Sequence, residues 1–133
     1  MQGMYLTDSW YWNRDADSRT WARRFFEKQK RMPSSLQAAD YSAALTYLKA
    51  VKATGTDDAE KVLAHMRKTR INDMYAKDGF VRPDGRMVHD MYLMQVKTPA
   101  QSTEPWDYYS VLQTVAGESS WTTKAESKCA LWK

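Results

Sequence analysis

The side chains that could do chemistry in this 133-residue chain are few. His89 and Asp90 are adjacent in the stretch GRMVHDMYLMQVK, and a histidine beside a carboxylate is the pairing of a general base with the group that orients it. In a strand, however, adjacent side chains point to opposite faces, so these two cannot form that pair on one surface. We therefore interpret His89–Asp90 as the polar start of a buried strand rather than as a reactive pair.

The remaining reactive side chains also lack a catalytic pattern. His65 is distant from His89 in the sequence, and no His-x-x-x-His or Cys-x-x-Cys spacing occurs, so we predict neither a metal site nor a cofactor. Cys129, the only cysteine, has Lys128 beside it but no histidine that could activate the thiol. These residues thus contain no enzyme signature. One alternative stays open, in which an oligomer gathers His65, His89, Asp90 and Cys129 into a hydrolase-type site between subunits.

Composition and charge narrow the class of protein. Hydrophobic residues make up 43% of the chain and charged residues 27%, which is typical of one globular domain. The formal charge is +4, and a basic cluster at residues 23–31 lies on an expected helix. Acidic residues are interleaved throughout, so we predict a solvated helix face and no nucleic-acid partner. No secretory signal pattern is visible, so the chain as written is expected in the cytoplasm.

These residues are held by elements that the sequence also indicates. Apolar spacing predicts three helices, which begin at Asp17 or Ser18, at Ser34 or Ser35, and at Thr56 or Asp57. Strands are expected at residues 3–7, 88–97 and 106–116, with turns between residues 70 and 86 and a coil tail after 116. Because Met91 to Met94 is unbroken apolar sequence, we expect this strand to be covered on both faces.

The start of the second helix is the candidate binding region. Gln37 and Tyr41 lie one turn apart there, on a helix rich in alanine. A helix start presents free backbone N–H groups, which favour an anionic ligand.

Several long blocks also resemble one family. They are MPSSLQAADYSAALTYLKAVKATGTDDAEKVLAHMR, INDMYAKDGFVRPDGRMVHDMYLMQVKTPAQSTEPWDYYSVL and ESKCAL. The chain resembles the C-terminal third of type I periplasmic solute-binding proteins of ABC importers, in the branch for branched-chain amino acids and organic or aromatic acids. The resemblance implies binding of a small carboxylate for uptake, delivery to a membrane permease, and a periplasmic location for the full-length family.

The resemblance also implies a fold and site residues. It implies an α/β fold, or α+β as a fragment, with about three helices followed by a small sheet. Residues 1–86 would belong to the first lobe, 87–116 would cross the hinge into the second, and 117–133 would be a coil tail. Ligand-binding residues carried over are Gln37, Ala38, Tyr41 and Trp12, and Cys129 would pair with an upstream cysteine.

A third of a two-lobe protein has uncovered strand edges and helix faces. Such surfaces drive association. We therefore expect a homodimer or a larger homo-oligomer.

Overall fold

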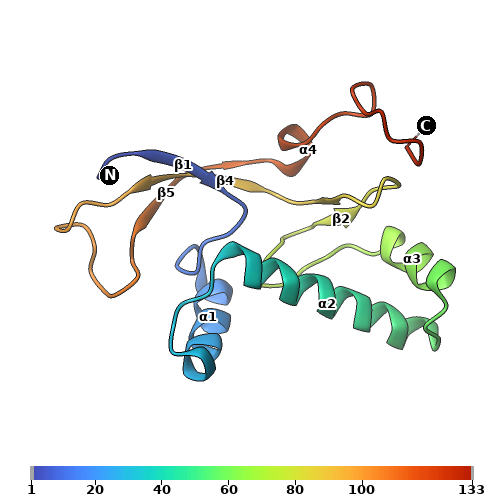
Figure 1. The fold of residues 1–133 in the computed structure, drawn as a ribbon, viewed down its shortest axis with the longest axis horizontal. Helices are drawn as coiled ribbons and strands as arrows, with labels where there is room; N and C mark the ends of the chain where they lie inside the picture. The colour runs from blue at the N-terminus through green and yellow to red at the C-terminus, as the bar shows by residue number, and fades with distance from the viewer. Residues whose placement is uncertain (1, 133) are drawn as a thin grey trace.

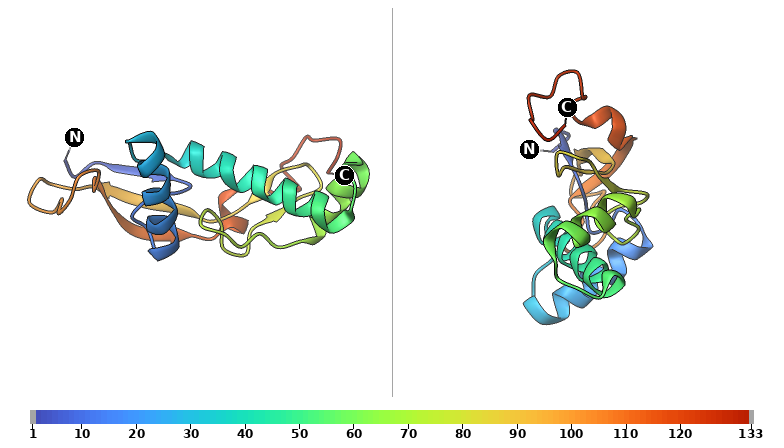
Figure 2. Two further views of the ribbon diagram at one scale, coloured as in Figure 1. Left: turned by 90° about the horizontal axis from the view of Figure 1, so that it is seen from below. Right: turned by 90° about the vertical axis from the view of Figure 1, so that its right-hand side faces the viewer.

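A three-stranded antiparallel sheet and three helices build the architecture in the computed structural model, which describes residues 2–132. The sheet has the order β1-β4-β5, with β1 spanning Tyr5–Asp8, β4 Met91–Val96 and β5 Tyr109–Val115. The helices lie together on one side of this sheet (Figure 1). The longest, α2 (Ser35–Thr54), runs along the long axis of the molecule (Figure 2). The predicted α/β class is confirmed, although the first strand precedes the helices and joins the sheet that follows them.

Two of the helices begin at an aspartate whose carboxylate accepts a hydrogen bond from a free backbone N–H group. Helix α1 (Ala16–Gln29) is capped by Asp15 and α3 (Ala59–Lys68) by Asp58, so the predicted starts were wrong by one to three residues. Helix α2 (Ser35–Thr54) begins at Ser34, as predicted. Its C-cap, Gly55, has φ 66°, a left-handed conformation in which glycine carries no steric penalty.

The segment between α3 and β4 forms a short hairpin as well as the predicted turns. Strand β2 (Phe80–Val81) pairs with β3 (Met87–Val88). The connecting turn holds Gly85 at φ 83°, and Arg82 makes a two-point ion pair with Asp84. After β5, the tail begins with one helical turn, α4 (Gly117–Ser120), where a coil was expected.

The expectation that β4 is covered on both faces was wrong. Tyr92 and Met94 are buried, whereas Met91 and Leu93 are half-buried, which is the alternation of a sheet covered mainly on one face. Both neighbours of β4 are antiparallel, and antiparallel sheets need only one packed face.

Aromatic residues after β1 fill the core beneath the covered face. Trp10, Tyr11 and Trp12 are almost fully buried, and the Trp10 ring meets the Trp21 ring edge-on at 5.6 Å. This packing joins the sheet to α1.

A buried ion pair fixes the loop between β4 and β5. The Lys97 Nζ lies 2.6 Å from Oδ2 of Asp107, whose side chain is 1% exposed. Burial raises the pKa of Asp107, but hydrogen bonds from Lys97, Thr103 and Asn13 outweigh it and leave that pKa below its ordinary value. Burial raises the pKa of the neighbouring Tyr11 to about 12.

Candidate functional site

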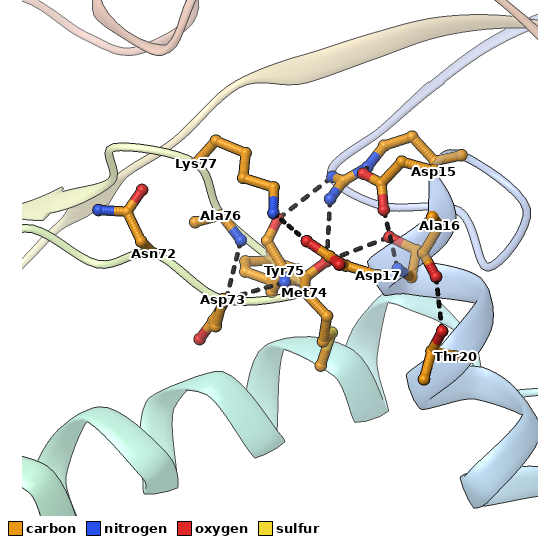
Figure 3. Close-up of polar contacts among 12 residues, drawn as sticks. Asp15, Ala16, Asp17, Thr20, Asn72, Asp73, Met74, Tyr75, Ala76 and Lys77 are labelled. Carbon is orange, nitrogen blue, oxygen red and sulfur yellow. Dashed lines mark hydrogen bonds and ion pairs between the residues drawn. The ribbon is translucent and has the colours of Figure 1, made fainter.

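A loop at residues 73–77 is clamped between α1 and the sheet. The Met74 carbonyl accepts hydrogen bonds from Trp10 Nε1 (2.9 Å), an Arg14 guanidinium nitrogen (2.9 Å) and Ser18 Oγ (3.1 Å). Arg14 also donates to the Tyr75 carbonyl (3.2 Å). Figure 3 shows this loop against the start of α1. The clamp holds Tyr75 in one position.

Helix α2 holds the same loop from its other side. The Asp73 carboxylate accepts from the backbone N–H groups of Tyr75 (2.8 Å) and Ala76 (3.0 Å), and its other oxygen accepts from Ser42 Oγ at 2.6 Å. Asp73 therefore closes the turn, and its contact with the fully buried Ser42 fixes the loop against α2.

An open groove of about 640 Å³ lies beside this loop and is the candidate site. Helix α2 contributes part of its wall, and the rest comes from the clamped loop, the β2–β3 hairpin, the β3–β4 link and the tail. Its lining residues are Ala39, Asp40, Ala43, Tyr75, Asp84, Gly85, Arg86, Met87, His89, Trp121 and Cys129.

Three rings line one side of the groove. The His89 ring lies 5.0 Å from the Tyr75 ring and 5.2 Å from the Trp121 ring, between centroids. Tyr75 and His89 are buried, and Trp121 is half-buried. The side thus offers flat, mainly apolar surface, which suits an aromatic or aliphatic group.

The state of His89 follows from its contacts. Its Nδ1 lies 2.8 Å from the carbonyl oxygen of Asp90, which only accepts, so Nδ1 carries the proton. Burial lowers the pKa of His89, which keeps the ring neutral at pH 7 and leaves Nε2 as an acceptor, 3.5 Å from the Tyr75 hydroxyl. The Asp90 carboxylate instead accepts from Gly117 N–H at 3.0 Å.

His89 and Asp90 therefore form no catalytic pair. The reason given from the sequence, that a strand places them on opposite faces, was wrong. Both residues lie in the link between β3 and β4 rather than within a strand. Their side chains are separated because each has its own backbone partner.

Opposite charges also border the groove. The Arg86 guanidinium stacks on the Trp121 ring at 4.6 Å and, among residues 2–132, has no hydrogen-bonded or ionic partner. Asp84 is already paired with Arg82, and the hydrogen bonds from Arg82 lower the pKa of Asp84. The exposed Asp40 stands on α2. Arg86 is thus available to an anion and Asp40 to a cation.

The predicted ligand residues take different positions. Gln37 is exposed, but its Oε1 accepts from Ser34 N–H (2.8 Å) in the helix cap. Tyr41 is 40% exposed and packs on Trp21 at 5.3 Å. Ala38 has no exposed surface, and Trp12 is 3% exposed, with Nε1 donating 2.8 Å to the Trp106 carbonyl.

The residues of the alternative, hydrolase-type reading are brought together only in part. His89 and Cys129 line the same groove, whereas His65 lines a separate pocket between α2 and α3 with Lys49 and Asp73. Within residues 2–132, no group of three or more His, Cys, Asp or Glu side chains could hold a metal ion.

Sequence reasoning missed Arg14, Tyr75, Arg86 and Trp121. Arg14 lies 60 residues from Met74, and no local spacing reveals such a contact. The one local signal was the turn pair Asp84–Gly85 directly before Arg86, which placed that arginine beside a tight turn.

Comparison with known proteins agrees with this architecture. A family model described as periplasmic binding protein matches residues 1–103. The chain therefore belongs to the periplasmic binding protein family.

Solved structures match over nearly the whole chain. A periplasmic binding protein from Burkholderia mallei is 63% identical, with a TM-score of 0.95 over 99% of this chain and 35% of that one. A branched chain amino acid ABC transporter periplasmic ligand-binding protein from Burkholderia xenovorans is 44% identical, with a TM-score of 0.96 over 100% of this chain and 36% of that one. The chain thus spans about a third of the length of these relatives.

An amino acid ABC transporter substrate-binding protein from Pseudomonas fluorescens, 23% identical with a TM-score of 0.83, shares the fold over 97% of this chain and 34% of that one. No curated protein matches the chain. Among the helices built by residues 2–132, none has the length and apolar character to cross a bilayer.

Proposed function

We propose that this chain is part of a solute-binding protein of an ABC importer and contributes to binding a small amino acid or an organic or aromatic acid. The observation that carries the proposal is the 63% identity to a periplasmic binding protein, with the same fold over 99% of the chain. The Burkholderia xenovorans relative, a branched chain amino acid transporter protein by name, supports the class of ligand.

The groove beside the 73–77 loop supports a carboxylate ligand. Arg86 offers a guanidinium fork without an ionic partner among residues 2–132, and carboxylates bind such forks through two hydrogen bonds. The rings of Tyr75, His89 and Trp121 would contact the apolar part of the ligand. Gln37 and Tyr41 would extend the site along the start of α2, while Ala38 and Trp12 would hold their neighbours in place.

Calorimetric titration with L-leucine, L-phenylalanine and benzoate tests this function. We expect at least one to bind, and Arg86→Gln to weaken it by about tenfold or more, because a charge-assisted hydrogen bond contributes about 1.5–3 kcal/mol. Arg24→Gln, at an exposed position on α1, is the matched control. Absence of binding by all three acids at millimolar concentration would refute the proposal.

The lobe assignment and the location belong to the same proposal. Residues 1–86 would lie in the first lobe and 87–116 in the hinge-crossing and second-lobe segment, followed by the tail. The protein would work in the periplasm and deliver its ligand to a membrane permease. Fractionation of cells that express the full gene, followed by immunodetection, would test the location.

We also propose that the chain self-associates through the open edge of the sheet. Strand β5 is an edge strand, and its Val111 and Leu112 are 38% and 49% exposed. Unpaired strand edges with apolar side chains favour pairing with a second copy. Sedimentation velocity should show a dimer that Leu112→Lys dissociates, and a monomer at all concentrations would contradict self-association.

A further inference from the structure

A second pocket lies between the C-terminal half of α2 and the end of α3, apart from the groove. Helix α3 turns back beside α2 after Gly55 (Figure 1). The pocket has a volume of about 240 Å³, and it shares no lining residue with the groove. Pockets for drug-sized ligands are larger, about 300–1,000 Å³, so this pocket suits a smaller molecule.

The buried part of the pocket lining is apolar. Ala50 and Ile71 are 2% and 5% exposed, and Met66 is half-buried. These side chains offer apolar surface to the carbon skeleton of a ligand, while the polar groups at the opening fix its orientation.

Three basic residues also line the pocket, and each comes from a different segment. Lys49 lies on α2, His65 on α3, and Arg70 in the segment that follows α3. Among residues 2–132, the side-chain nitrogens of Lys49 and His65 have no hydrogen-bonded or ionic partner. Lys49 and Arg70 thus bring positive charge to the pocket from two different walls.

Arg70 is positioned by its neighbours but not neutralised. Its guanidinium stacks on the Phe80 ring at 4.7 Å, and one of its nitrogens donates to the Asp78 carbonyl at 3.3 Å. The Asp78 carboxylate lies 3.8 Å from the guanidinium, and the two side chains are 56% and 75% exposed. An ion pair this open to water is weak, so a ligand can replace it.

Within the described part of the chain, residues 2–132, a single carboxylate lines the pocket, and it is already satisfied. Asp73 accepts from two backbone N–H groups through one oxygen and from Ser42 Oγ through the other. The Oδ1 of Asn72 accepts from the Asp78 N–H at 2.8 Å, so the Nδ2 of Asn72 is left as a donor. The groups still available to a ligand are therefore mainly cations and hydrogen-bond donors.

We propose that this pocket binds a small organic dianion, a dicarboxylate with a short carbon chain. Arg70 holds one carboxylate through its guanidinium fork and Lys49 holds the other, while Ala50 and Ile71 contact the carbons between them. Charges on two walls with apolar surface between them match a carbon chain charged at each end better than the single centre of a phosphate. The site does not depend on which solute the groove binds.

Calorimetric titration of the chain with glutarate tests the site, with butyrate and inorganic phosphate as comparison ligands. We expect glutarate to bind, and butyrate, which lacks the second carboxylate, to bind at least tenfold more weakly. Arg70→Gln and Lys49→Gln should each weaken glutarate binding about tenfold or more. Lys52→Gln, at an exposed position on α2 outside the pocket lining, is the matched control and should leave glutarate binding within threefold.

NMR of side-chain N–H groups locates the bound glutarate. It should shift the amide signals of Asn72, which lines the pocket, and leave the indole signal of Trp121, which lines the groove. Circular dichroism of the three variants should match that of the unmodified chain, because the replaced side chains are exposed.

Four results would overturn the proposal. They are absence of glutarate binding at millimolar concentration, phosphate binding as tight as that of glutarate, equal affinities of Arg70→Gln and Lys52→Gln, and a shift of the Trp121 signal in place of the Asn72 signals. Titrations with the solutes proposed for the groove use other ligands and the Arg86→Gln variant, so either proposal can fail while the other stands.

Discussion

Replacement of Lys97 by methionine is expected to reverse the pH dependence of stability. The substitution keeps most of the side-chain volume but removes the cation beside Asp107, which is 1% exposed. Removing one partner of a buried ion pair costs about 3–5 kcal/mol. Because Asn13, Thr103 and Tyr11 still donate to the carboxylate, we expect the lower end, about 3 kcal/mol, in the free energy of unfolding at pH 7.

The expected change in melting temperature follows from chain length. At about 2.1 cal/mol/K per residue, 133 residues have an unfolding entropy of about 0.28 kcal/mol/K, so about 3 kcal/mol corresponds to a decrease of about 10 °C. Thermal unfolding followed by circular dichroism at pH 7 measures it.

The sign of the pH dependence of stability shows whether Lys97→Met acts through the lost charge or through altered packing. In the unmodified chain the pKa of Asp107 is lowered, so its stabilisation is present above the unfolded pKa and is lost as the pH falls through the folded pKa. Without Lys97, burial raises that pKa, and the variant loses stability as the pH rises above the unfolded value. The stability difference between the two proteins should therefore shrink as the pH falls below the ordinary aspartate pKa.

A double substitution supplies the control. Lys97→Met with Asp107→Asn removes the unpaired charge, so this protein should be more stable at pH 7 than Lys97→Met alone. An unchanged stability difference between pH 7 and pH 3, or a double variant less stable than the single one, would show that packing rather than charge is responsible.

Three further perturbations probe the candidate site. Arg14→Met removes the donor to the Tyr75 carbonyl and should lower the free energy of unfolding by about 2–4 kcal/mol in urea titrations, whereas Arg24→Met, at an exposed position on α1, should not. Gly117→Ala places a Cβ 2.7 Å from the His89 carbonyl group and should cost about 1–3 kcal/mol by the same measurement, and full stability would refute the close packing. The pKa of the His89 ring, measured by NMR, should lie below its ordinary value of 6.5. Because the unfolded chain takes up this proton first, the free energy of unfolding should fall as the pH drops through 6.5 towards the folded pKa. A His89→Gln variant should lack this pH dependence.

The sequence alone predicted most of the local structure. Ser34 and the turn at Asp84–Gly85 lie where expected, because caps and turns depend on residues within about four positions. The starts of α1 and α3 were misplaced by one to three residues because several neighbouring Asp, Ser and Thr side chains can cap a helix, and only packing selects among them.

The site depended on contacts that local patterns do not contain. Gln37 and Tyr41 could be chosen as binding residues from the start of a helix, but their contacts with Ser34 and Trp21 could not be assigned, and their ligand-binding role stays a prediction. Placing His89 and Asp90 in a strand was wrong because the two residues link β3 and β4, which belong to different sheets, and backbone partners then separate the two side chains.

The sequence by itself thus determined the helices, the strands β1, β4 and β5, the turns and the family, because these follow from residue types at short spacing and from long blocks of similar sequence. Tertiary structure decided that Arg14 clamps a loop 60 residues away, that Asp107 is buried against Lys97, and that Arg86 stands beside the ring of Trp121. These features arise from burial and from hydrogen bonds between distant segments, and such contacts exist only once the chain has packed.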